Sequence, residues 1–207
     1  MRQKWLSSGN GFYMEDSDFL SFDEMIEMMS TDEICQYLTP KHCFFSYVSR
    51  KYDTIDEDLV QQREFVLRFK AGNGIDVAHA ASITAQYLMQ SGLQEEYTFL
   101  CLPASTPSKH KKRFSRFMQK VAKLTGIQNG YDLIEVKRRR GEVHAGAARS
   151  VKNYTISSSV KGKKIVLFDD VHTTGKSFAS FACELEKLGA EVVYGVFLAE
   201  AETPWNI

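Results

Sequence analysis

The 207-residue chain lacks the long apolar runs that mark membrane and secreted proteins. No stretch approaches the roughly 20 apolar residues that a membrane-spanning helix needs, and residues 1–10 contain no apolar signal core. With only 4 prolines, the chain also has no Pro-rich linker, and it shows no low-complexity tract or internal repeat. We therefore expect a cytoplasmic protein with no membrane contact and one sizeable core.

Metal-binding and disulfide signatures are also missing. The cysteines are Cys35, Cys43, Cys101 and Cys183. None belongs to a Cys-x-x-Cys pair, and the histidines outside residues 141–159 have no acidic or cysteine partner at metal spacing. These observations predict reduced thiols and no structural zinc.

Net charge is zero, but the charges are unevenly distributed. Residues 1–64 hold 13 acidic and 6 basic residues, whereas residues 101–164 hold 16 basic and 3 acidic residues. A small polyanionic ligand would explain the basic block. A solvated basic face and a nucleic-acid surface are the alternatives.

The first third of the chain is expected to be helical. A capping box at 21–24 predicts a short helix through Met29, and residues 30–33 could open another that ends before Pro40. A third capping box at 54–57 opens a helix that ends near Gly72. We expect residues 1–60 to form an N-terminal helical or hood segment, and residues 61–207 to form the main domain.

Strands and helices alternate in the rest of the chain. Strands are predicted at 97–102, 132–136, 165–168 and 191–198. Helices are predicted at 77–89 with Asp76 as cap, at 114–124 and at 177–188. This alternation predicts an α/β fold with a doubly wound, mainly parallel sheet.

The most informative segment, residues 165–177, reads I-V-L-F-D-D-V-H-T-T-G-K-S. Its apolar run suits a strand buried on both faces, and Asp169 and Asp170 follow where ligand groups collect in an open α/β sheet. Two carboxylates can accept hydrogen bonds from ribose hydroxyls or hold Mg²⁺. The loop 173–177 offers hydroxyls and backbone N–H groups to a phosphate. The segment therefore predicts a phosphorylated sugar as ligand.

The ATP-binding P-loop is the obvious competitor for this segment. That motif requires Gly-x-x-x-x-Gly-Lys-Ser/Thr. Gly175, Lys176 and Ser177 are present, but Asp170 occupies the position of the first glycine. A carboxylate there would face the phosphates, which excludes the P-loop.

The segment resembles the phosphoribosyl-pyrophosphate (PRPP) motif of type I phosphoribosyltransferases. The resemblance implies that Asp169 and Asp170 are catalytic, contact the ribose and bind Mg²⁺ directly or through water. It also implies a site for the 5′-phosphate of PRPP, made of Thr173, Thr174, Gly175, Lys176 and Ser177. Residues 60–200 resemble the ComF-like branch of the family most, without that branch's zinc-binding N-terminus.

Pyrophosphate binding is expected on two further segments. The loop after the first predicted strand contains Ala104 and Ser105, and the resemblance places pyrophosphate there. It also implies a basic residue after the second strand, which Lys137 and Arg138 match, and a mobile loop at 141–159. His144 lies in that loop, where an acid/base role competes with a bystander role.

The resemblance implies a pentosyltransferase that displaces pyrophosphate from C1 of PRPP with a nitrogenous base or amine. The expected cofactor is Mg²⁺, and the expected partners are PRPP and a small-molecule acceptor; nucleic acid is disfavoured, and a homodimer is open. Two alternatives remain. One is a non-catalytic sensor of PRPP or a nucleotide, and the other is a ComF-like protein associated with DNA uptake.

Overall fold

The computed structural model describes residues 7–8, 11–12, 34, 39–51, 56–138 and 153–202. Near the N-terminus, β1 (Ser7–Ser8) and β2 (Gly11–Phe12) form an antiparallel pair. The helices expected from the capping boxes at 21–24 and 30–33 lie almost wholly outside the described residues, so they stay predictions. The division of the chain at residue 60 also stays a prediction.

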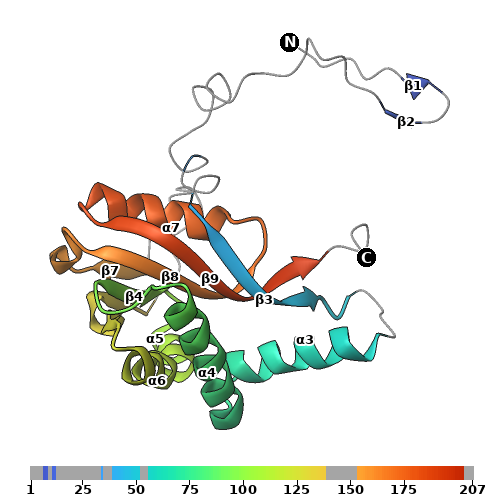
Figure 1. Ribbon diagram of the computed structural model, residues 1–207, viewed down its shortest axis with the longest axis horizontal. Coiled ribbons are helices and arrows are strands. Elements are labelled where there is room, and N and C mark those ends of the chain that lie inside the picture. The colour runs from blue at the N-terminus through green and yellow to red at the C-terminus, as the bar shows by residue number, and fades with distance from the viewer. Residues whose placement is uncertain are drawn as a thin grey trace, which may run out of the picture.

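A five-stranded parallel sheet forms the centre of the protein (Figure 1), in the order β3-β9-β8-β4-β5. The strands are β3 (Lys41–Val48), β9 (Glu191–Glu202), β8 (Lys164–His172), β4 (Tyr97–Cys101) and β5 (Gln128–Asn129). Every neighbouring pair in this sheet is parallel. The predicted mainly parallel α/β sheet is confirmed.

The central strand β8 is buried on both faces, as its apolar run predicts. Val166 and Phe168 belong to one hydrophobic cluster, whereas Ile165 and Leu167 belong to the other. This alternation follows from the two-residue period of a strand. Each cluster is the core between the sheet and one layer of helices.

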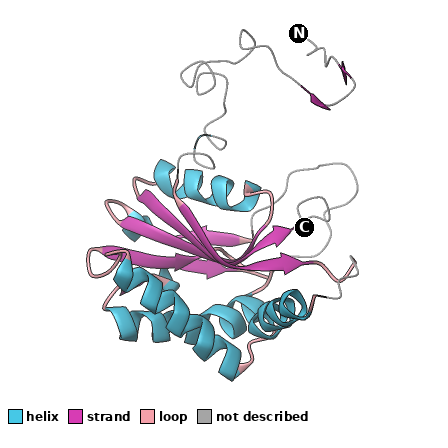
Figure 2. Cartoon of the chain, turned by 45° about the vertical axis from the view of Figure 1, so that its right-hand side comes forward, coloured by secondary structure: helices cyan, strands magenta, loops and turns pink. Residues whose placement is uncertain are grey.

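Helices cover both faces of the sheet (Figure 2). One layer contains α3 (Glu57–Lys70), α4 (Gly74–Gln90), α5 (Pro107–His110) and α6 (Arg116–Thr125). The other contains α7 (Lys176–Lys187). Phe69 and Phe117 enter the first core and Phe178 enters the second, all almost completely buried. The doubly wound arrangement is therefore confirmed.

The helix starts differ in detail from the sequence-based expectations. Asp56 caps α3 by accepting a hydrogen bond from the Leu59 N–H at 3.0 Å. Asn73, rather than Asp76, caps α4. Asp76 instead forms a salt bridge with Arg68 at 3.0 Å and is largely buried. The sequence does not distinguish the two positions, because an acidic residue complements the helix dipole both at the N-cap and in the first turn.

The helix expected at 114–124 begins earlier, at Pro107. Between α5 and α6 lies η2 (Lys111–Ser115), a single π-helical turn. Such turns interrupt α-helices and are frequent at functional sites. The predicted stop at Gly126 is confirmed, since its φ of 79° is left-handed.

The observed strands differ from the sequence-based predictions in several places. The segment 132–136 does not supply a strand of the main sheet: β6 (Ile134–Val136) pairs antiparallel with β7 (Tyr154–Ile156) in a separate two-stranded sheet. Strand β3 was not predicted, because its half-buried aromatic run shows no clear alternation. Strand β8 does not end at Phe168 but continues through Asp169 and Asp170 to His172.

Three-residue 3₁₀ turns, η3 (Tyr131–Leu133) and η4 (Ser158–Val160), flank the small sheet.

Among the described helices, none combines the length and apolar character needed to cross a membrane.

At Gly130 the backbone lies too close to β4 for a side chain to fit. A Cβ at this position would lie 2.8 Å from the Phe99 carbonyl oxygen, which belongs to backbone and cannot move aside. Gly130→Ala should therefore lower the free energy of unfolding by about 1–3 kcal/mol, measured by urea denaturation. Gly74→Ala is the matched control, because a Cβ there would meet nothing within 4 Å. Equal effects of the two substitutions would contradict this account of the packing.

Candidate functional site

A cavity of about 380 Å³ lies at the carboxyl edge of β4 and β8. Its walls come from the loop after β4, from η2, from β7, from the end of β8 and from α7. The lining residues are Leu102, Pro103, Ala104, Ser105, Arg113, Phe114, Tyr154, Asp169, Asp170, Ser177, Ser180 and Phe181. This is where open parallel sheets bind ligands. The fold thus brings together the two predicted acids, the predicted 104–105 loop and Ser177.

Asp170 is held between two cations. One carboxylate oxygen lies 3.2 Å from the Lys70 Nζ, and the other accepts a short hydrogen bond from the Arg113 Nη1. The Asp170 side chain is only 7% exposed. Burial of a carboxylate this deep is unfavourable unless opposite charges pair with it, and Lys70 and Arg113 do so. We call these three residues the Asp170 clamp.

Each cation of the clamp is positioned by its own element. Lys70 is the last residue of α3, and its Nζ lies 5.5 Å from the centre of the Tyr47 ring on β3. Arg113 lies in the π turn η2, with its guanidinium 5.5 Å from the Phe114 ring. The Arg113 Nε is buried and has no hydrogen-bond partner among the described residues. The Nε–H is therefore a donor that the contact of Arg113 with Asp170 does not use.

Asp169 is in a different environment from its neighbour. Because β8 continues past both acids, their side chains leave the strand on opposite faces. One Asp169 oxygen accepts the backbone N–H of Asp170 at 2.8 Å. Burial, and secondly the negative charge of Asp170, raise the pKa of Asp169 to about 7. Asp169 is therefore the carboxyl of the cavity that changes protonation near neutral pH.

The loop after β4 is fixed from two sides. The Ala104 N–H donates to the Nδ1 of His110 at 3.4 Å. The Asn153 side-chain amide donates to the carbonyls of Ala104 and Ser105 at 3.3 and 2.9 Å. Ala104 is buried, whereas Ser105 is exposed in the cavity wall. Ala104 thus shapes the loop, and Ser105 is the residue that can offer polar groups to a ligand.

His110 can fill this role because its ring is neutral. Burial, and secondly the charge of Arg113, lower the pKa of His110 to about 4. A neutral imidazole keeps one nitrogen as an acceptor for the Ala104 N–H. The ring stacks on Tyr131 with 5.3 Å between centroids, which fixes its plane.

The predicted phosphate loop follows β8 directly. Gly175 is buried and adopts a left-handed φ of 71°, and α7 begins at the next residue. Thr173, Thr174 and Lys176 are exposed. Only Ser177 of this loop lines the cavity. The loop therefore lies at the N-terminus of a helix with its side chains open to solvent, a suitable place for an anion.

Tyr154 closes the cavity on the side of the small sheet. Its hydroxyl donates to the Glu184 carboxylate at 3.0 Å, and its ring packs edge-on against Phe181. Burial, and secondly the hydrogen bond to Glu184, raise the pKa of Tyr154. Tyr154 therefore stays protonated and keeps β7 attached to α7.

The predicted basic pair after the second strand lies apart from the cavity. Lys137 and Arg138 are exposed, and the Lys137 Nζ lies 3.7 Å from a Glu135 carboxylate oxygen. Neither residue lines the cavity. Most of the expected mobile loop, including His144, lies outside the described residues.

Sequence reasoning missed four residues of this site: Lys70, Arg113, His110 and Asn153. Lys70 and Arg113 were visible only as members of a helix end and a basic run. Nothing in their local sequence distinguishes them from solvated charges, because their partner lies 100 and 57 residues away along the chain. The π turn that aims Arg113 inward has no sequence signature of its own.

Comparisons with known proteins give distant structural neighbours. No protein-family model matches the sequence. The allosteric regulatory enzyme of purine biosynthesis matches 58% of this chain, with 19% identity and a TM-score of 0.43. The chain covers only 25% of that enzyme.

Two smaller neighbours are phosphoribosyltransferases. Adenine phosphoribosyltransferase from Thermoanaerobacter pseudethanolicus matches 62% of this chain and 70% of its own length, with 17% identity and a TM-score of 0.41. Purine phosphoribosyltransferase from Pyrococcus horikoshii matches 65% of this chain and 91% of its own, with 19% identity and a TM-score of 0.40. These values are too low to assign a family, so the fold class rests on the observed sheet.

The Asp170 clamp should contribute strongly to stability. Arg113→Gln leaves a buried carboxylate with one charged partner, so the free energy of unfolding should fall by about 2–4 kcal/mol. Arg50→Gln is the matched control, because the Arg50 side chain is 66% exposed in its salt bridge with Glu64. That change should have a much smaller effect, because exposed ion pairs contribute little to stability. Urea denaturation of both variants measures the difference, and similar losses would argue against the clamp.

Asp169 should make stability depend on pH. Its folded pKa of about 7 exceeds the ordinary value of 3.8, so the folded protein binds a proton between these pH values that the unfolded chain has lost. Stability from this group therefore falls as pH rises through that window. Asp169→Asn cannot ionise and keeps an acceptor for the Asp170 N–H.

The variant should match the wild type at pH 4. At pH 8 it should be more stable, by up to about 4 kcal/mol at about 1.4 kcal/mol per pKa unit. Denaturation curves across this range test the expectation, and a gap independent of pH would contradict it.

Proposed function

We propose that this chain is a phosphoribosyltransferase that binds PRPP with Mg²⁺ and displaces pyrophosphate from C1 of the ribose with a nitrogenous base or amine. One observation carries the proposal. Residues from three separate segments, Asp169, Ser177 and Ser105, line one cavity at the carboxyl edge of the parallel sheet. A carboxylate between two loops suited to anions matches a sugar with phosphates at both ends.

Different residues of the cavity would bind different parts of PRPP. Asp169 would accept hydrogen bonds from the ribose hydroxyls. The loop 173–177 would bind the 5′-phosphate through its N–H groups and the Ser177 hydroxyl. Ser105 would face the pyrophosphate, on a loop that His110 and Asn153 hold rigid. Rigid placement of donors contributes to catalysis because no reorganisation is needed as charge develops.

Arg113 would contact the pyrophosphate leaving group as well as Asp170. Its Nη1 is committed to Asp170, but its buried Nε has no partner among the described residues. A guanidinium in the cavity wall can stabilise negative charge that grows as the bond to pyrophosphate breaks. Lys137 and Arg138, the residues first expected in this role, would have to move to reach the cavity.

The described residues fit Mg²⁺ as part of a complex with PRPP. No group of three or more histidine, cysteine or acidic residues among them could hold a metal unaided. Mg²⁺ commonly binds through one or two carboxylates together with substrate phosphates. One oxygen of Asp169 accepts the Asp170 N–H, and the other has no hydrogen-bond partner in the part of the chain that the structure describes. When bound, the metal would neutralise charge on the pyrophosphate.

A PRPP sensor without turnover is the second candidate, and the clamp is the observation that favours it. Both oxygens of Asp170 are engaged by Lys70 and Arg113, so only Asp169 remains for the ribose. A protein that senses PRPP has to bind it but does not have to catalyse a reaction. Assignment to the ComF-like branch, the identity of the acceptor and a homodimer stay predictions.

Release of pyrophosphate distinguishes the two candidates. The protein should release pyrophosphate when incubated with PRPP, Mg²⁺ and a panel of purines, pyrimidines and amines. Ser177→Ala should raise the KM for PRPP roughly tenfold, as expected for about 1.4 kcal/mol from a lost hydrogen bond to a charged group. Ser158→Ala, an exposed serine in η4, is the matched control.

Saturable PRPP binding without release from any acceptor would favour the sensor. Absence of PRPP binding in calorimetry would reject both candidates.

A further inference from the structure

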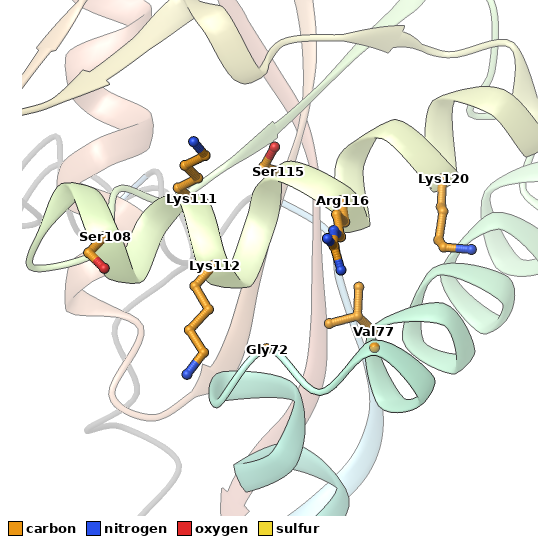
Figure 3. A pocket seen from close by; sticks show the side chains of 9 residues that line it. Gly72, Val77, Ser108, Lys111, Lys112, Ser115, Arg116 and Lys120 are labelled. Carbon is orange, nitrogen blue, oxygen red and sulfur yellow. The ribbon is translucent and has the colours of Figure 1, made fainter.

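A second hollow, of about 480 Å³, lies on the helical layer (Figure 3). One wall is the turn between α3 and α4, with Gly72, Gly74 and Val77. The other wall is formed by α5, η2 and the start of α6. No residue lines both hollows. We call this second hollow the basic groove.

Its charges are all positive. Lys112, Arg116 and Lys120 follow one another at intervals of four residues, so they share one helical face. In Figure 3 the Lys112 side chain extends toward the turn at Gly72, and the Arg116 side chain extends toward Val77 on α4. Lys120 lies further along the same helix beside α4, whereas Lys111 points the other way. No acidic residue lines the groove. The three cations are exposed and form no salt bridge with any described residue.

This arrangement has an electrostatic cost that a ligand would remove. Like charges four residues apart on a helix destabilise it. Gly72 adds to the positioning: a Cβ there would lie 2.5 Å from the Lys112 Cγ, so the stem of Lys112 lies directly on the Gly72 backbone. An anion in the groove would offset the repulsion between the three cations.

The lining also indicates the class of anion. Val77 is the only large apolar side chain, and no aromatic ring lines the groove. A nucleobase would find no stacking partner there, and stacking on aromatic residues supports most single-strand binding by proteins. The hydroxyl of Ser108 adds a hydrogen-bonding group at one end. These features fit a compact chain of phosphates rather than a base or a nucleic-acid strand.

We propose that the basic groove is a second anion site, which binds a small polyphosphate through Lys112, Arg116 and Lys120. The site is independent of the proposed transferase activity. Both cations of the Asp170 clamp are close in sequence to lining residues of the groove: Lys70 lies two residues before Gly72, and Arg113 directly follows Lys112. A polyphosphate in the groove thus contacts the two segments that position the clamp.

Inorganic triphosphate is the probe, and calorimetry on the full chain without Mg²⁺ is the measurement. Wild-type protein should bind triphosphate saturably. The double variant Lys112→Gln, Arg116→Gln should weaken this binding at least tenfold. The double variant Lys161→Gln, Lys164→Gln removes the same charge at exposed positions outside the groove and should bind as the wild type does. Ser177→Ala, which alters the first cavity, should also leave this binding unchanged.

Three results would overturn the proposal. The first is equal binding by the two double variants, which would mean that net charge alone attracts the probe. The second is loss of binding in Ser177→Ala, which would place triphosphate in the Asp169 cavity. The third is tighter binding of a mixed-sequence oligonucleotide than of triphosphate through the same residues, which would make the groove a nucleic-acid surface. Circular dichroism of each variant checks folding, and pyrophosphate release is measured separately, so that failure here leaves the proposed function untouched.

Discussion

The structure of this protein depends on how one buried carboxylate is kept charged. Asp170 lies in the central strand of the sheet, and without partners a charge in that position would be strongly unfavourable. Lys70 reaches it from the end of α3, and Arg113 reaches it from the π turn. The clamp thereby ties two separate helical segments to β8. It fixes one wall of the cavity and one wall of the basic groove at the same time.

The clamp also separates the roles of two adjacent acids. The sequence pair Asp169-Asp170 suggests two equivalent ligands for a sugar. In the folded chain the strand continues through both, so they leave it on opposite faces. Asp170 is paired with two cations. Asp169 has a raised pKa, and one of its oxygens lacks a hydrogen-bond partner among the described residues. The pair thus combines a structural charge with a carboxyl available to a ligand.

Much of the fold could be predicted because its signals are local. The apolar run before Asp169 predicts a strand buried on both faces, and the helices that end at Gly72, Gly126 and Gly189 follow from periodicity and stop signals. The errors have physical causes. Strand β6 has the composition of a sheet strand, but it pairs only with β7. Edge strand β3 is half-buried at all positions before Val48, so it lacks the alternation that identifies strands.

The α/β class, the central strand and the position of the cavity at its carboxyl end could be predicted from the order of the amino acids, because these features depend on residues adjacent in the chain. Which charges act together depends on the folded structure. Lys70, Arg113 and Asp170 are distant in sequence, and a charge–charge interaction depends on separation in space and on burial. Likewise, the groove of Lys112, Arg116 and Lys120 exists only because the turn between α3 and α4 packs against that helical face.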